Sequence, residues 1–122
     1  MKINLVALGM EMTPAIREYA EKKLAMLEKK LGGAADEALA TLELKKTTNH
    51  HQNGSLFRAE LRLSAGKEKI VVAQEAEDLY AAIDAMKDEA IREATARHDR
   101  SIAAARKGGR EIKKMLHSSE AE

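Results

Sequence analysis

Lysines recur at helical spacing in the first third of the chain, and binding of phosphate groups is the chemistry that they could support. At about 100° per residue, four of them fall on one flank of an apolar stripe, and nearby glutamates fall toward the other flank and the outer face. The lysines are Lys22, Lys23, Lys29 and Lys30, and the glutamates are Glu18, Glu21 and Glu28. Lysines stacked two turns apart could bind phosphates along a nucleic acid. The alternative, which the pattern by itself favours, is a helix whose charges serve solubility, with Glu18–Lys22 as an i,i+4 pair.

A second group of basic residues follows in the last third of the chain. The candidates for RNA binding there are Lys87, Arg92, Arg97, His98 and Arg100, followed by Arg106, Lys107, Arg110, Lys113 and Lys114. The whole chain has a formal net charge of +1, whereas residues 97–114 alone carry +5. A basic segment behind a mildly acidic body indicates either a polyanionic partner or a tail kept solvated by its charge, and charge alone does not separate the two.

Residues that could catalyse a reaction or hold a metal are few. The chain has no cysteine, which excludes a disulfide framework, a thiolate nucleophile and a Cys-ligated metal. His50 and His51 are neighbours that rarely complete a ligand set, and Asp78 suits a helix N-terminus better than a catalytic pair with Asp84. No phosphate-binding loop, H-E-x-x-H motif or nucleophile elbow is present. We therefore predict a protein that is not an enzyme, with no catalytic residue, metal site, cofactor or small-molecule substrate.

Aromatic residues make up only 2% of the chain, which limits how it could recognise RNA. Phe57 falls on the apolar side of a predicted strand, and Tyr19 and Tyr80 adjoin the apolar stripes of predicted helices. Readers of single-stranded RNA usually stack bases on exposed aromatic side chains. The sequence thus predicts recognition of phosphate geometry and shape, without base identity.

The first helix has clear boundary signals. Thr13 is a good N-cap ahead of Pro14, and Gly32-Gly33 ends the apolar stripe, so a helix is predicted over residues 14–31. The remaining signals predict strands at 3–8, 41–45, 57–64 and 69–73, a loop at 47–54 with a tight turn at Asn53-Gly54, a turn at 65–68 and a second helix at 76–105. Gly108-Gly109 breaks the helical pattern. We therefore predict a domain at 1–105 and a basic tail without regular structure at 106–122.

The element order β-α-β-β-β-α predicts an α+β fold. A right-handed crossover makes the first two strands parallel, and two hairpins make the other pairs antiparallel, which gives a four-stranded mixed sheet. Both helices should pack on one face, an arrangement like that of double-stranded-RNA-binding domains. The other face should be wet, and its residues would include Thr41, Glu43, Lys45, Arg58, Glu60 and Arg62. No stretch approaches the about 20 apolar residues of a membrane helix, and no signal peptide is visible, so we expect a cytoplasmic protein without a membrane partner.

Two phrases open the two predicted helices. The first is M-E-M-T-P-A-I-R-E-Y at Met10–Tyr19, and the second is E-D-L-Y-A-A-I-D-A-M at Glu77–Met86. At this separation they resemble the bacterial ribosome hibernation factors, a family of translation inhibitors and hibernation-promoting factors that is also called the sigma-54 modulation proteins. The resemblance covers roughly residues 1–100. It implies a monomer that binds ribosomal RNA of the small ribosomal subunit, in the channel used by messenger and transfer RNA, and that blocks translation sterically while stabilising idle ribosomes.

The resemblance also bears on individual residues. Lys23 and Arg92 occupy positions where the family usually carries basic side chains, whereas Met26, Glu89 and Ala96 replace lysines that relatives often have. The chain resembles the short forms of the family, and its tail has the length of those that oppose ribosome pairing. Two alternatives from other classes stay open. One is a general double-stranded-RNA binder, and the other is a protein-interaction module.

Overall fold

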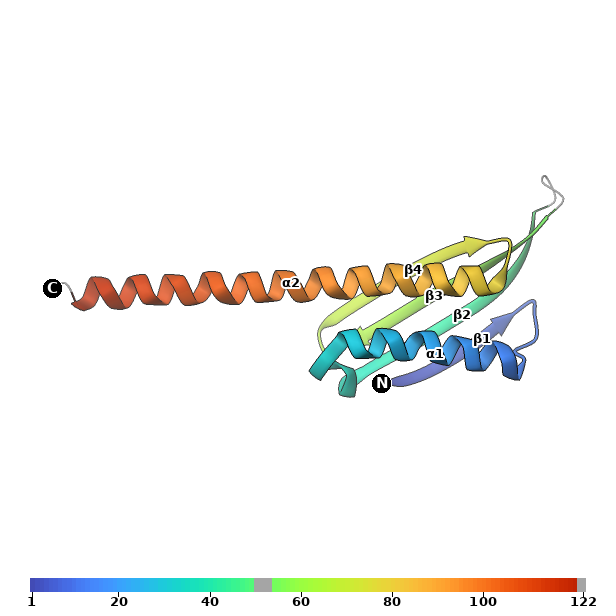
Figure 1. The fold of residues 1–122 in the computed structure, drawn as a ribbon, viewed down its shortest axis with the longest axis horizontal. Helices are drawn as coiled ribbons and strands as arrows, with labels where there is room; N and C mark the ends of the chain where they lie inside the picture. Colours follow the sequence, from blue (N-terminus) through green and yellow to red (C-terminus); the bar gives the residue numbers. More distant parts are fainter. Residues whose placement is uncertain (50–53, 121–122) are drawn as a thin grey trace.

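The computed structural model describes residues 1–49 and 54–120 (Figure 1). Its elements are β1 (Lys2–Leu8), α1 (Pro14–Leu31), the 3₁₀ helix η1 (Gly32–Glu37), β2 (Ala38–Asn49), β3 (Gly54–Ala65), β4 (Glu68–Ala76) and α2 (Leu79–Glu120). This order contains the predicted β-α-β-β-β-α succession, with η1 as an addition at the end of the first helix.

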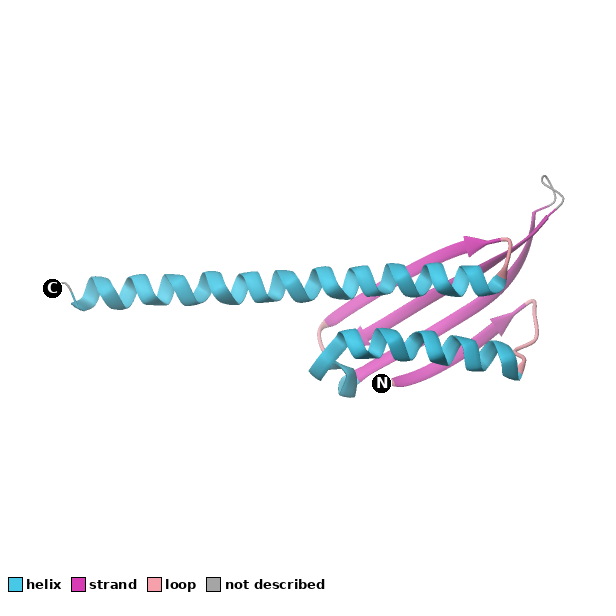
Figure 2. Ribbon diagram, viewed as in Figure 1, coloured by secondary structure: helices cyan, strands magenta, loops and turns pink. Residues whose placement is uncertain are grey.

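The four strands form one mixed sheet in the order β1-β2-β3-β4. β1 and β2 are parallel and pair from Lys2 opposite Leu39 to Leu8 opposite Lys45, and the β2–β3 and β3–β4 pairs are antiparallel. Both helices lie on the same face of the sheet (Figure 2). The predicted fold class is therefore confirmed, including the parallel pairing of the first two strands.

The boundaries of α1 agree with the prediction from its end signals. The hydroxyl oxygen of Thr13 accepts a hydrogen bond of 3.2 Å from the backbone N–H of Ile16, and Pro14 follows at a position where no N–H is needed. At the other end Gly32 has φ of +58°, a value that residues with a Cβ rarely adopt. The chain turns there into η1 and from it into β2.

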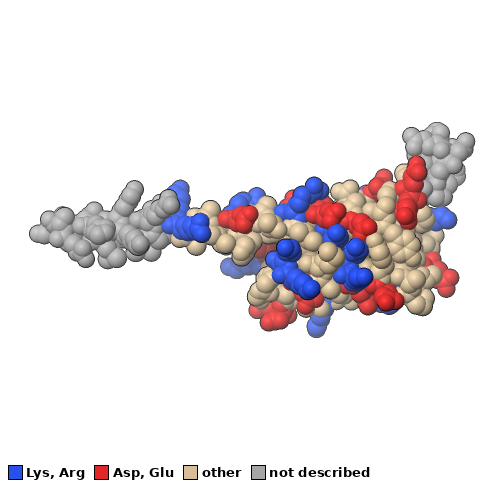
Figure 3. Space-filling model, in the orientation of Figure 1, with Lys and Arg blue, Asp and Glu red and all other residues tan. Residues whose placement is uncertain are grey.

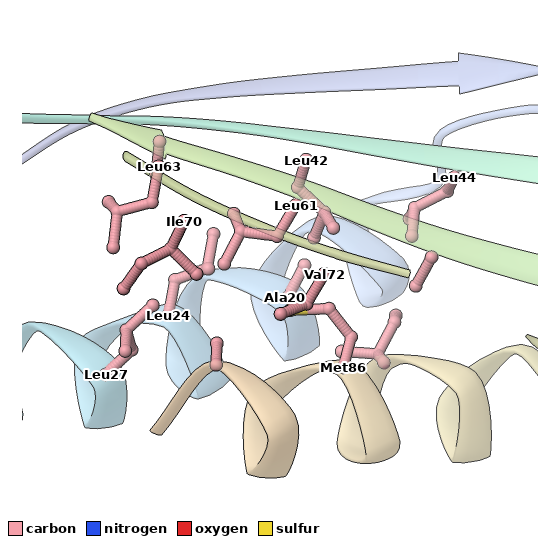
Figure 4. Close-up of a cluster of buried hydrophobic side chains, with 14 of the residues drawn as sticks. Ala20, Leu24, Leu27, Leu42, Leu44, Leu61, Leu63, Ile70, Val72 and Met86 are labelled. Atoms are coloured by element: carbon pink, nitrogen blue, oxygen red, sulfur yellow. The ribbon is translucent and has the colours of Figure 1, made fainter. Parts of the chain in front are cut away.

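The core is a single apolar layer between the sheet and the two helices (Figure 4). Alternate residues of β2, β3 and β4 point into it, and they meet the predicted stripes of α1 and α2. Its largest fully buried side chains are Leu24, Leu27, Leu42, Leu44, Leu61, Ile83 and Met86. Every buried residue in the described part of the chain is apolar, so the core needs no hydrogen bonds between its side chains.

The β2–β3 hairpin is longer than predicted. Thr47 to Asn49 and Gly54 pair within the strands, with Asn49 opposite Gly54, where the sequence suggested a loop over 47–54. Threonines fit a strand well even where no core lies beneath them, and this preference prevails over the polar composition of the segment. Residues 50–53 lie outside the described residues, and with them Asn53 of the predicted turn and the candidate metal pair His50 and His51.

Both ends of α2 differ from the prediction of 76–105. Ala76 still belongs to β4, and the helix begins after Asp78, whose backbone carbonyl accepts from the N–H of Ala82 and whose side chain accepts from the N–H of Tyr80. At the other end the helix continues through Gly108-Gly109 to Glu120. The predicted break at these glycines is wrong, and residues 106–120 are helical. A glycine inside a helix costs only about 1 kcal/mol relative to alanine, which a long hydrogen-bonded helix tolerates.

Candidate nucleic-acid interface

A polar cluster joins α1 and α2, and we call its residues Tyr19, Lys23, Tyr80 and Asp84 the helix-junction cluster. The Tyr19 hydroxyl donates a 2.8 Å hydrogen bond to Oδ2 of Asp84, and Nζ of Lys23 lies 3.2 Å from Oδ1 of the same carboxylate. Lys23 also lies over the Tyr19 ring, with Nζ 5.1 Å from the centroid. The Tyr80 ring meets the Tyr19 ring edge to face at a centroid distance of 4.8 Å. Three of these contacts join α1 to α2, and the contact between Lys23 and the Tyr19 ring lies within α1.

The electrostatics of this cluster keep Asp84 ionised. Burial alone would raise the pKa of the Asp84 carboxyl, but the hydrogen bond from Tyr19, the ammonium of Lys23 and the charge of Lys87 outweigh burial and hold the pKa below its ordinary value of 3.8. The bond to Asp84, followed by burial and the nearby negative charge, raises the pKa of Tyr19. At neutral pH the neutral phenol of Tyr19 therefore donates to the carboxylate of Asp84, and this hydrogen bond holds α1 against α2.

The two aspartates that could have formed a catalytic pair have separate structural tasks. Asp78 accepts a 3.0 Å hydrogen bond from the backbone N–H of Tyr80 and so caps α2. Asp84 contacts α1 instead. Sequence reasoning left the role of Asp84 open. A signal for it was available, because Tyr19 and Asp84 belong to the two phrases that open the helices.

The lysines of α1 divide into paired and unpaired residues. Lys22, Lys29 and Lys30 are exposed, and the structure gives them no ion-pair partner among the described residues. Lys23, by contrast, is only 20% exposed and is held by Asp84. On the opposite flank of α1, Glu28 lies 3.7 Å from the α-amino group of Met1. Lys23 thus lies toward α2, and Glu28 lies toward the start of β1.

Most of the basic residues of α2 within the domain already have partners. Lys87 is 12% exposed and lies 2.6 Å from Asp88, and Arg92 pairs with Glu89. Arg97 pairs with Glu68 of β4 and lies 3.9 Å from Glu93. His98 and Arg100 are exposed, and no described carboxylate pairs with them. Figure 3 shows Lys and Arg side chains gathered along the junction of the helices, with Asp and Glu to either side.

The open face of the sheet has a different character. None of the six residues predicted to be wet there is buried. Glu60 lies within 4.0 Å of both Arg58 and Arg62, and Arg58 also pairs with Glu75. Val6, Leu8, Leu39 and Val71 are exposed between these charges. The two arginines of this face are therefore paired with carboxylates, whereas Lys45 and Lys69 are exposed without a described ion-pair partner. Because unpaired lysines are more numerous along α1, we take the helical face as the better candidate for binding a polyanion.

The basic candidates beyond the domain lie on the projecting part of α2. Arg106 and Lys107 are exposed. Arg110, Lys113 and Lys114 belong to the same helix, but their side chains lie outside the described part of the structure. Whether the division into a domain at 1–105 and a separate basic segment has functional meaning stays a prediction.

Among the described residues, no three His, Cys, Asp or Glu side chains come together in a way that could hold a metal ion. No helix in that part of the chain is both long and apolar enough to cross a membrane. The three aromatic side chains all pack within the fold, although Tyr80 remains 39% exposed.

The sequence and structure were compared with known proteins. Residues 3–102 match the family described as Sigma 54 modulation protein / S30EA ribosomal protein. The chain belongs to this family. Relatives in the family include the ribosome hibernation promoting factors of Klebsiella oxytoca, 28% identical over 100 residues, and of Salmonella typhimurium, 29% identical over 100 residues. In both cases the match covers 82% of this chain and 96% of the relative.

Solved structures agree with the family assignment. The N-terminal domain of Thermus thermophilus protein Y superposes with a TM-score of 0.63 at 33% sequence identity, covering 77% of this chain and 96% of that one. A ribosomal subunit interface protein from Coxiella burnetii gives a TM-score of 0.66 at 17% identity, covering 81% and 99% of the two chains. At that identity the second likeness supports the fold alone.

Proposed function

We propose that this protein is a ribosome-associated translation inhibitor of the hibernation type. It binds the small ribosomal subunit in the channel used by messenger and transfer RNA. It blocks translation by occupying that channel and stabilises the idle ribosome. No covalent bond is made or broken, and neither a cofactor nor a small-molecule substrate takes part.

The observation that carries this proposal is the set of exposed, unpaired cations on the helical face. Lys22, Lys29, Lys30 and Arg100 have no described ion-pair partner, so their charges are available to phosphate groups. Two relatives whose sequences match 82% of this chain are named ribosome hibernation promoting factors, which makes ribosomal RNA the polyanion to propose.

The helix-junction cluster gives this surface the rigidity that binding by shape requires. Lysines recognise phosphates as point charges, so the spacing between α1 and α2 decides which phosphates they reach. Tyr19 and Asp84 fix that spacing through a 2.8 Å hydrogen bond across the junction. A preorganised surface loses less conformational entropy on binding, which favours occupancy of a rigid channel.

Charge reversal on α1 tests the proposal. Lys22→Glu combined with Lys29→Glu should abolish co-sedimentation with purified small subunits, because each lost charge-assisted contact is worth about 1.5 kcal/mol and two of them weaken binding roughly 100-fold. Both residues are exposed, so thermal unfolding should be unchanged. Lys45→Glu combined with Lys69→Glu, on the open face of the sheet, is the matched control and should bind normally. Normal binding of the α1 variant would disprove the proposed surface.

A second measurement separates this proposal from a general RNA binder. The wild-type protein is titrated with small subunits, with large subunits and with an unrelated RNA duplex at two salt concentrations. We expect retention on the small subunit alone, weakened by salt because phosphate contacts release counterions. Equal affinity for the unrelated duplex would favour the general binder instead.

A further inference from the structure

A cavity of about 210 Å³ opens where α1 ends and α2 leaves the sheet. Its walls come from five elements that are far apart in sequence, namely α1, η1, β3, β4 and α2. Both apolar and charged side chains line it. Its lining includes Ala94, Arg97 and His98 of α2. Figure 1 shows α2 continuing beyond the sheet.

The floor of this cavity is apolar. Leu63, Ile70 and Ala94 are buried members of the core, and Leu31 packs partly against it. Ala34, whose side chain is small, also belongs to the lining. Water finds few hydrogen-bond partners over such a floor, so a flat apolar ring is a better occupant.

The rim of the cavity is polar. Lys30, Arg97 and His98 line it together with the carboxylate of Glu68, which pairs with a terminal nitrogen of Arg97. Nε of Arg97 is buried and has no hydrogen-bond partner among the described residues, because the carboxylate of Glu93 lies 3.9 Å away, beyond hydrogen-bond distance. Glu68 itself is 65% exposed. A buried donor without an acceptor is costly, and an anion arriving at the rim could supply that acceptor.

From this combination we infer that the cavity binds one nucleotide. The base lies on Leu63, Ile70 and Ala94, and the phosphate is held by Lys30, Arg97 and His98 after Glu68 turns away into solvent. Insofar as the nucleotide belongs to ribosomal RNA, this inference rests on the proposed function. A free mononucleotide has the same chemistry, and the experiments below distinguish the two sources.

Size and surroundings favour a nucleotide over other anions. The volume is below the about 300–1,000 Å³ of pockets for whole drug-sized ligands, which fits a single ring system. Unpaired bases in folded RNA can be splayed out and stacked on flat side chains of a protein. Tyr19 and Phe57 are engaged within the fold and Tyr80 packs against Tyr19, so the apolar floor of the cavity is the surface left for a base. Lys30 belongs both to this rim and to the lysine flank of α1, so a strand bound to the helices passes the opening.

The first test measures AMP binding and then blocks the cavity with a larger side chain at Ala34. Isotope-labelled full-length protein is titrated with AMP and, separately, with ribose 5-phosphate, and amide shifts are followed by NMR. We expect AMP to move the signals of Leu63, Ile70 and Ala94, and ribose 5-phosphate to bind roughly tenfold more weakly because the base is missing. Ala34→Leu should remove the AMP shifts, and Ala15→Leu, at an exposed helical position outside the cavity, should not. AMP shifts that survive Ala34→Leu, or none in the wild type, overturn the inference.

The second test removes one positive and one negative charge from the rim, and the two substitutions should change AMP affinity in opposite directions. Arg97→Gln should weaken AMP binding roughly tenfold through loss of the phosphate contact, and Glu68→Gln should strengthen it by removing the competing carboxylate. These variants also cover the case in which Ala34→Leu disturbs folding. If neither exchange alters AMP affinity, the phosphate does not lie at this rim and the inference fails.

Co-sedimentation with small subunits then identifies the source of the nucleotide. Reduced binding of Ala34→Leu relative to Ala15→Leu assigns the cavity to a base of ribosomal RNA. If AMP shifts the signals of the wild-type protein but Ala34→Leu still binds ribosomes normally, the cavity is assigned to a free nucleotide. Wild-type protein that binds AMP in the cavity but ignores small subunits would overturn the proposed function and leave the nucleotide site standing. If the wild-type protein binds small subunits but shows no AMP shifts, and Ala34→Leu does not alter ribosome binding, the nucleotide site is overturned and the proposed function stands.

Discussion

At the scale of single residues, one hydrogen bond explains why the two opening phrases occur together. Tyr19 ends the first phrase, Asp84 lies near the end of the second, and their side chains meet 65 residues apart in sequence. Lys23 joins them through its ion pair with Asp84. A residue predicted to contact RNA therefore also stabilises the surface on which the neighbouring lysines are displayed, and the two roles need separate measurements.

The stability contributed by Asp84 should depend on pH. Its pKa is lowered on folding, so the stabilisation is fully present above its ordinary pKa of 3.8 and is lost as the pH falls through the folded value. Asp84→Asn should reduce the free energy of unfolding at neutral pH by about 0.2 to 1 kcal/mol, the range for solvent-exposed ion pairs. The difference from wild type should shrink below pH 3.8. Urea denaturation over a pH series measures it.

Asp36→Asn is the matched control for this series, because Asp36 is exposed and has no described ion-pair partner. A difference between wild type and Asp84→Asn that stays constant at acidic pH would contradict the electrostatic explanation and point to altered packing instead.

At the scale of elements, the sequence predicted what local signals decide. The ends of α1 could be predicted because their signals act within a few residues. Thr13 caps the first turn, Pro14 has a fixed φ that suits a helix start, and Gly32 adopts a positive φ at the end. The end of α2 could not be predicted, because Gly108-Gly109 weakens the helix without ending it. Likewise the status of each cation depends on its neighbours in space. Lys22 and Lys23 are adjacent in sequence, yet only Lys23 meets a carboxylate of the other helix.

The glycines of α2 offer a test at this scale. Gly108→Ala and Gly109→Ala should each stabilise the projecting part of the helix by about 0.5 to 1 kcal/mol, because alanine loses less backbone entropy on helix formation. Amide hydrogen exchange of residues 106–120 should slow in these variants, while exchange of the sheet stays the same. Ala104→Gly, the converse change one turn earlier, should accelerate it. Unchanged exchange in all three variants would mean that the helix is not continuous there.

At the scale of the whole molecule, charge and shape separate into two regions. The sheet and the first half of α2 form a domain, from which the second half of α2 projects (Figure 1). At about 1.5 Å per residue, the 42 residues of α2 extend over roughly 63 Å. No residue beyond Ala94 belongs to the core cluster in the described part of the chain. The near-neutral total of +1 thus conceals a basic projection on a mildly acidic domain.

Neutralising the projection should change how salt affects ribosome binding. Replacement of Arg106, Lys107, Arg110, Lys113 and Lys114 by Gln should leave the unfolding temperature of the domain unaltered. Each phosphate contact to a single strand contributes about 0.7 to the magnitude of the slope of log affinity against log salt. If all five side chains contact phosphates, this magnitude should fall by up to about 3.5. Co-sedimentation with small subunits at several salt concentrations gives this slope. An identical slope would show that the projection does not contact phosphates.

The parallel pairing of β1 with β2 has a consequence for how the chain assembles during synthesis. Lys2 pairs with Leu39, and α1 and η1 lie between them in sequence. Translation adds about 5–20 residues per second, so β1 waits for seconds without its partner while α1 can already form. β2, β3 and β4, by contrast, close through local hairpins as each strand emerges. We therefore expect the sheet to grow from its hairpins toward β1, so that the strand made first is the last to dock.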